Sequence, residues 1–154
     1  MTATQALSAT RDVDVPCQQV WDVMADGWTY TQWVVGNSRT RAVDANWPQP
    51  GAAIRHSIGV WPFVINDQTV VESCARLHEL VLHAGMGRLG AARITMRLAE
   101  IPDGCRVQMI EVPIQGPISL IPYRVALMAI RPCNRGCLWR LGAVAERLEP
   151  GQVK

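Results

Sequence analysis

The sequence has few charged residues and almost no excess of either sign. Charged side chains make up 18% of its 154 residues, and the formal net charge is +2. These values indicate neither a basic surface for nucleic acid nor a highly charged tail. We therefore expect small or apolar partners and no nucleic acid.

Long apolar runs are also missing. The best candidate, residues 120–130, is interrupted by Pro122 and Arg124, and it falls short of the roughly 20 residues that a membrane-spanning helix needs. The first fifteen residues lack the basic and apolar segments of a secretory signal peptide. The sequence predicts no membrane span and a cytoplasmic location.

Cysteine is scarce and odd in number. The five cysteines are widely scattered, whereas secreted disulfide frameworks usually pair an even number. We predict reduced thiols. Cys133 and Cys137 lie one helical turn apart, but no histidines or carboxylates complete a tetrahedral set, so we predict neither a metal nor another cofactor.

Familiar catalytic motifs are absent or out of context. No serine stands in a nucleophile-elbow sequence. Residues 85–90 match G-x-G-x-x-G, but that fingerprint must open a helix, and residues 91–101 alternate with period two. We interpret residues 85–90 as a glycine-rich hairpin loop.

Apolar residues are plentiful, at 49% of the chain. A chain of this length and composition can build one hydrophobic core without help from a metal or disulfides. We find no repeats, and we predict a single domain over residues 1–154.

The first part of the chain predicts a strand followed by two short helices. Residues 7–15 alternate between apolar and polar positions. Pro16 suits a first helical turn, and apolar residues then recur at helical spacing until Asp26. A second short helix is expected over residues 28–35, ended by Gly36 and Asn37.

An antiparallel meander and a long helix are expected to follow. After a strand that begins at residue 38, the predicted strands are 52–60, 68–75, 77–84, 91–101 and 105–114, with a hairpin tip at Asn66 and Asp67. Beyond residue 117 the apolar period becomes helical. Pro132 cannot donate its backbone N–H, so the helix should be kinked or broken near Arg131. The predicted class is α+β, with a curved antiparallel sheet of about seven strands gripping a long C-terminal helix.

Several stretches also resemble a known superfamily. They are residues 15–24 (VPCQQVWDVM), 51–55 (GAAIR), 67–72 (DQTVVE), 104–111 (GCRVQMIE) and the helical segment 131–141. In this order of elements they resemble the START-like helix-grip superfamily, also called SRPBCC or polyketide cyclase/dehydrase-like, and its small actinobacterial-type members. The resemblance implies a cavity between the sheet and the terminal helix that accepts lipids, hormones, polyketides or other apolar molecules.

Two ionisable residues are predicted to face that cavity. His56 shares one face of its strand with Ile58, and Glu111 is in register with Met109. A neutral imidazole can act as a general acid or base, and a carboxyl group in an apolar cavity has a raised pKa. Alternatively, both are structural groups with hydrogen-bond partners.

Large apolar side chains supply candidate ligand contacts. Six tryptophans stand against one phenylalanine; indole rings and methionines line pockets, although they also fill cores. The predicted contact residues are Trp28, Trp33, Ile58, Val60, Ile94, Met96, Met109, Tyr123 and Met128.

Three functions remain open. The first is a monomeric or homodimeric binder of a small hydrophobic molecule that is lipid-, aromatic- or polyketide-like. The second is a polyketide cyclase/dehydratase-type enzyme that uses His56 and Glu111 as an acid/base pair. The third is an interaction module whose core is filled by its own side chains. A cavity, and an ionisable pair converging in it, would separate them.

Overall fold

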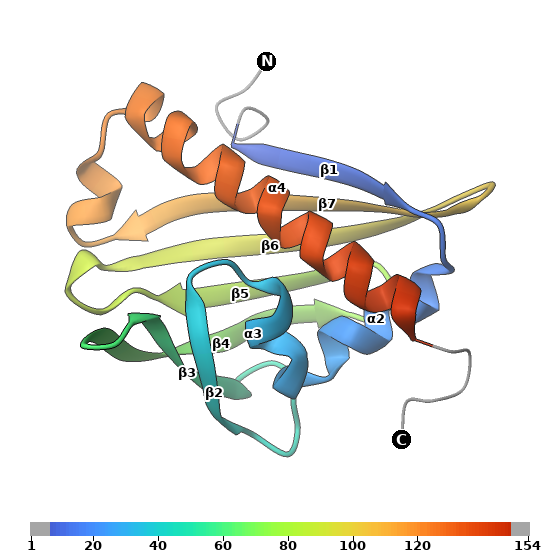
Figure 1. Ribbon diagram of the computed structural model, residues 1–154, viewed down its shortest axis with the longest axis horizontal. Coiled ribbons are helices and arrows are strands. Elements are labelled where there is room, and N and C mark those ends of the chain that lie inside the picture. The colour runs from blue at the N-terminus through green and yellow to red at the C-terminus, as the bar shows by residue number, and fades with distance from the viewer. Residues whose placement is uncertain (1–6, 149–154) are drawn as a thin grey trace.

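The computed structural model describes residues 7–148, in which one antiparallel sheet packs against a long helix (Figure 1). The strands are β1 (Ser8–Val13), β2 (Asn37–Val43), β3 (Ala53–Val60), β4 (Phe63–Ala75), β5 (Glu79–Gly85), β6 (Ala91–Ile101) and β7 (Gly104–Gln115). The helices are α2 (Cys17–Ala25), α3 (Tyr30–Trp33) and α4 (Tyr123–Arg147), with short 3₁₀ turns η1 (Gly27–Thr29), η2 (Gly87–Leu89) and η3 (Pro117–Leu120). The predicted α+β helix-grip class is confirmed.

The sheet has the order β1-β7-β6-β5-β4-β3-β2, with antiparallel pairing throughout. The first strand therefore pairs with the last, and the chain between them forms a meander. β6 shows why one face is covered. Ile94, Met96 and Leu98 are buried, while Arg93 and Arg97 point to the other side and form ion pairs with Glu72 of β4 and Glu79 of β5.

The core lies between the inner face of the sheet and the helices. α4 crosses this face (Figure 1) and buries Leu138, Leu141 and Ala145 against it. α2 adds Val20 and Val23 at the same end as the last turns of α4. These apolar contacts hold the helices on the sheet, because each buried aliphatic side chain contributes about 1.5–3 kcal/mol.

The predicted hairpin tip at Asn66 and Asp67 is wrong. β4 begins at Phe63, and both residues lie inside it. The turn is Trp61 and Pro62, and Val60 pairs with Phe63 across it. Turn-forming residue types misled the prediction because the Asp67 carboxylate has another role, accepting hydrogen bonds from backbone N–H groups of Gln68 and Gly87.

The helices also differ from expectation in detail. The second helical region divides into η1 and a four-residue α3. The terminal helix is not broken, because α4 runs through Pro132. Both Pro132 and Met128, whose carbonyl loses its donor, are exposed, so water can take the place of the missing hydrogen bond. No helix among residues 7–148 has the length and apolarity to cross a membrane.

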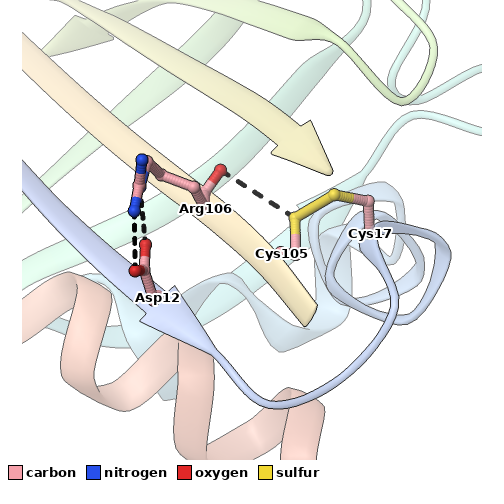
Figure 2. Close-up of polar contacts among 4 residues, drawn as sticks. All are labelled: Asp12, Cys17, Cys105 and Arg106. Carbon is pink, nitrogen blue, oxygen red and sulfur yellow. Dashed lines mark hydrogen bonds and ion pairs between the residues drawn. A yellow bond between two sulfur atoms is a disulfide. The ribbon is translucent and has the colours of Figure 1, made fainter. Parts of the chain in front are cut away.

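A disulfide corrects the prediction of reduced thiols. Cys17, at the start of α2, is bonded to Cys105, at the start of β7, with Cα atoms 4.9 Å apart (Figure 2). Beside it, Arg106 of β7 donates two hydrogen bonds to Asp12 of β1. The two cysteines are 88 residues apart in sequence, so only the fold reveals their proximity. Cys74, Cys133 and Cys137 are free.

Candidate functional site

A cavity of about 150 Å³ lies between the inner face of the sheet and α4. The sheet supplies its walls from β3, β5, β6 and β7, and the α3 region and α4 close it. Its lining residues are Tyr30, Val34, Val35, Gly36, Asn37, His56, Ile58, Ala84, Gly85, Met86, Ile94, Met109, Glu111, Cys133 and Cys137.

Five of the predicted site residues meet in this cavity. His56 and Ile58 come from β3, Ile94 from β6, and Met109 and Glu111 from β7. The alternation of side chains along each of the three strands turns all five toward α4. The two ionisable residues therefore share one mostly apolar space.

The other predicted contact residues lie elsewhere. Trp33 and Met96 are buried in the core and do not line the cavity. Trp28, Val60, Tyr123 and Met128 are exposed, with 42–79% of their surface accessible. Val60 ends β3 beside a turn, Trp28 sits on η1, and Tyr123 and Met128 belong to the first turns of α4, so none reaches the inner face.

A buried threonine fixes the orientation of His56. The Thr69 hydroxyl lies 2.9 Å from His56 Nε2 and 2.9 Å from the Tyr30 hydroxyl. All three residues are at most 2% exposed. Because a hydroxyl both donates and accepts hydrogen bonds, Thr69 satisfies the two partners at once. The imidazole is thereby held with its other nitrogen, Nδ1, unused.

Two buried polar atoms of cavity-lining residues have no hydrogen-bond partner among residues 7–148. They are His56 Nδ1 and Asn37 Oδ1. Buried polar groups are nearly always hydrogen-bonded, and leaving one unpaired costs about 1–3 kcal/mol. Two such atoms on one cavity mark where a bound molecule would find hydrogen-bond partners.

Glu111 adds an unpaired carboxyl group to the same wall. It is half-buried, and it makes no hydrogen bond or ion pair with another residue in the described range. Burial raises its pKa from 4.5 to about 7. Near neutral pH the group is therefore protonated in a substantial fraction of molecules, and in that form it can donate a hydrogen bond.

Burial moves the neighbouring groups toward their neutral forms as well. It lowers the pKa of His56, which the nearby Asp67 raises to a lesser degree. It also raises the pKa of Tyr30 far above its usual range and that of Cys137 to about 11, and the charge of Glu111 contributes to both. The cavity thus offers neutral donors and acceptors, with Glu111 as its group that titrates near neutrality.

Sequence reasoning missed four polar residues of the site, namely Tyr30, Asn37, Thr69 and Cys137. The sequence could have identified Thr69 as an inward-facing residue, because it shares a strand face with the apolar Val71. The sequence predicts a helix end at Asn37, whereas its place on the cavity depends on the pairing of β2 with β3. The predicted meander pairs these two strands, but it begins the first of them at residue 38 and so leaves Asn37 outside the sheet, whereas β2 begins at Asn37.

A larger hollow of about 390 Å³ lies at the other end of the molecule, beside the disulfide. Its lining includes the exposed carboxylates of Asp14, Glu100 and Asp103. Exposed carboxylates are hydrated and need no partner. We therefore place the candidate site in the smaller internal cavity.

The sequence matches no protein-family model and no curated protein. Solved structures are nevertheless similar over nearly the whole chain. A protein from Nitrosomonas europaea superimposes with a TM-score of 0.71 at 12% identity, covering 91% of this chain and 93% of that one. The protein Ara h 8.0201 gives a TM-score of 0.70 at 10% identity, with coverages of 92% and 97%.

A third similar structure is the di-domain ARO/CYC protein StfQ from the steffimycin biosynthetic pathway. Its TM-score is 0.70 at 11% identity, and the match covers 90% of this chain and 49% of that one. Identities this low establish architecture and leave activity open. The chain has the START-like helix-grip fold that its sequence resembles.

Proposed function

We propose that this protein, as a single domain, binds a small hydrophobic molecule that carries one polar group. The observation that supports this most strongly is the pair of unpartnered groups, His56 Nδ1 and the Glu111 carboxyl, on one mostly apolar cavity. Ligand sites in proteins have this composition, with apolar walls and a few convergent polar atoms.

The volume limits the ligand. A space of about 150 Å³ is comparable to an apolar cavity that takes up one benzene ring. The ligand is therefore a single substituted ring, or one end of a longer lipid- or polyketide-like molecule whose remainder would extend past Cys133, a lining residue that is exposed to solvent. Ile94 and Met109 would contact the apolar part.

The polar atoms specify a hydroxyl or carbonyl group. Protonated Glu111 donates a hydrogen bond, and Asn37 Oδ1 accepts one. His56 Nδ1 takes either role according to its tautomer. An anionic ligand group would be disfavoured, because no lysine or arginine lines this apolar space to replace its hydration.

Binding of 4-ethylphenol and ethylbenzene tests the proposal. We expect 4-ethylphenol to bind roughly tenfold more tightly, because its hydroxyl satisfies a group that ethylbenzene leaves unpaired. Replacing Glu111 with Gln, which is similar in size but does not titrate, should abolish the pH dependence of phenol affinity. Isothermal titration at pH 6 and pH 8, on either side of the Glu111 pKa of about 7, measures both effects.

The matched control is Glu100→Gln, an exposed glutamate on β6 outside this cavity. It should leave both affinities unchanged. Binding of the two probes with equal affinity, or equal effects of the two substitutions, would contradict a polar subsite at Glu111.

A second candidate function is ring closure or dehydration of a polyketide-like chain. The specific observation in its favour is that the pKa of Glu111 is raised to about 7 while burial lowers that of His56. One group would take a proton from the carbon beside a carbonyl, and the other would protonate the alkoxide formed when that carbon attacks a second carbonyl. StfQ shares the fold.

The enzymatic candidate makes its own prediction. Turnover of a short β-polyketide thioester should fall about a hundredfold or more in Glu111→Gln and in His56→Asn. Product analysis by mass spectrometry measures it, with Glu100→Gln as the control. If the two variants bind the thioester and cyclise it at the wild-type rate, the pair is not catalytic. The filled-core interaction module receives no support, since the cavity is present.

A further inference from the structure

Large apolar side chains gather at one end of the molecule and are exposed to solvent. We define the loop-end patch by six residues that are 52–86% exposed, a high value for large apolar side chains. The patch comprises Val60, Trp61, Phe63, Leu89, Leu120 and Met128.

These residues come from four segments that meet at the same end of the sheet. The segments are the β3–β4 turn, η2, η3 and the first turns of α4, all on the left in Figure 1. Ile65 of β4 lies against Gly87 of η2, and Gly90 lies against Gln115 at the end of β7. η3 contacts both η2 and β7. The segments that carry the patch therefore adjoin one another at this end of the sheet.

The start of α4 is unusually open. Between residues 123 and 133, all of which the structure describes, Ala126 is the one buried residue. In the second half of the helix the inner stripe is buried against the sheet. The first turns thus present apolar side chains that no other residue between 7 and 148 covers.

Three arginines flank the patch, and none of them pairs with a carboxylate in the described part of the chain. Arg88 precedes Leu89, and Arg124 and Arg131 lie one helical turn before and after Met128. All three are exposed and form no ion pair with residues 7–148. Of the carboxylates at this end, Asp67 accepts hydrogen bonds from backbone N–H groups and Glu111 lines the cavity.

The unpaired arginines favour an anionic membrane over a second copy of the chain as the partner of this patch. A second copy meeting the patch across a twofold axis would oppose arginine to arginine, because both subunits use the same surface. A bilayer with anionic headgroups offers phosphates to the guanidinium groups and an apolar layer to the projecting side chains. We propose that the loop-end patch docks on an anionic membrane surface.

Docking would bring the cavity close to the bilayer. Ile58 and Met86 line the cavity, and each stands two or three residues before a patch residue, Val60 or Leu89. A hydrophobic molecule would then pass between membrane and cavity over a short path. The two proposals remain separable, since an empty cavity would leave the docking surface unchanged.

Vesicle co-sedimentation tests the docking surface. We expect binding to phosphatidylcholine vesicles that contain about one quarter phosphatidylserine, and roughly fivefold weaker binding for each arginine lost in Arg88→Gln and Arg124→Gln. The double variant Trp61→Ser, Phe63→Ser should bind at least tenfold more weakly, because both rings would insert into the interface. Neither change alters buried packing, so thermal unfolding should be preserved.

The matched controls lie in the second half of α4, away from the patch. Trp139 is 63% exposed, and Arg140 is exposed without an ion pair in the described chain; Trp139→Ser and Arg140→Gln should bind like the wild type. Equal losses in patch and control variants, or no vesicle binding by the wild type, would overturn the proposal. So would a dimer in sedimentation that the Trp61, Phe63 double variant abolishes, because the patch would then be a protein interface.

Discussion

Reduction of the Cys17–Cys105 disulfide is expected to lower the free energy of unfolding by about 4 kcal/mol. The bond links two cysteines that are 88 residues apart in sequence and so closes a long loop. Reduction opens this loop and increases the conformational entropy of the unfolded chain. It also joins α2 to β7, beside the ion pair of Asp12 with Arg106 (Figure 2). Denaturant unfolding with and without reductant measures the difference.

The disulfide prediction has an internal control. Cys74 is a free cysteine, so Cys74→Ser should keep the response to reductant, and the double variant Cys17→Ser, Cys105→Ser should lose it. The double variant should unfold at lower denaturant even without reductant. A wild type that unfolds identically with and without reductant would show that the two thiols are not bonded in solution.

Stability should fall as the pH rises from about 5 to about 8, by about 2 kcal/mol through Glu111 alone. Its pKa is 4.5 in the reference state and about 7 in the folded protein, because burial disfavours the charge. The folded state therefore holds the proton after the unfolded chain has lost it, and each pKa unit is worth at most about 1.4 kcal/mol. The contribution is complete below pH 4.5 and is lost above pH 7.

Comparison with Glu111→Gln isolates this contribution. Unfolding free energies of both proteins across the pH range should diverge, with the wild type losing stability relative to the variant as pH increases. Glu100→Gln, at an exposed position on β6, should follow the wild type. Parallel curves for the wild type and Glu111→Gln would mean that the carboxyl group is solvated in the folded state.

The fold was predictable because its pattern is periodic. Alternation in β6 and the helical stripe around Leu138 and Leu141 each reflect one buried face, and burial dominates the energetics. The ends of strands and helices were less predictable, because residue types that usually end an element can also occur inside one. Asp67 has a turn-forming side chain but serves inside β4, and Pro132 breaks helices in general yet is tolerated on the exposed side of α4.

The site was predictable only in part. Alternation gave the inward faces of His56 and Glu111, because a strand needs no partner to define its two sides. Contacts that depend on tertiary approach were not accessible, including the hydrogen bond of Thr69 to Tyr30 and the meeting of Cys17 with Cys105. Tyr123 and Met128 are exposed because they belong to the first turns of α4, which extend beyond the cavity.

The most direct test of the binding proposal is the position of 4-ethylphenol on the protein in solution. Intermolecular nuclear Overhauser effects should connect its ring protons with the side chains of Ile58, Ile94 and Met109, which line the cavity. They should disappear on competition with a tighter cavity ligand. Contacts confined to the surface around Trp61 and Phe63, or no contacts at saturating concentration, would contradict a ligand site inside the sheet.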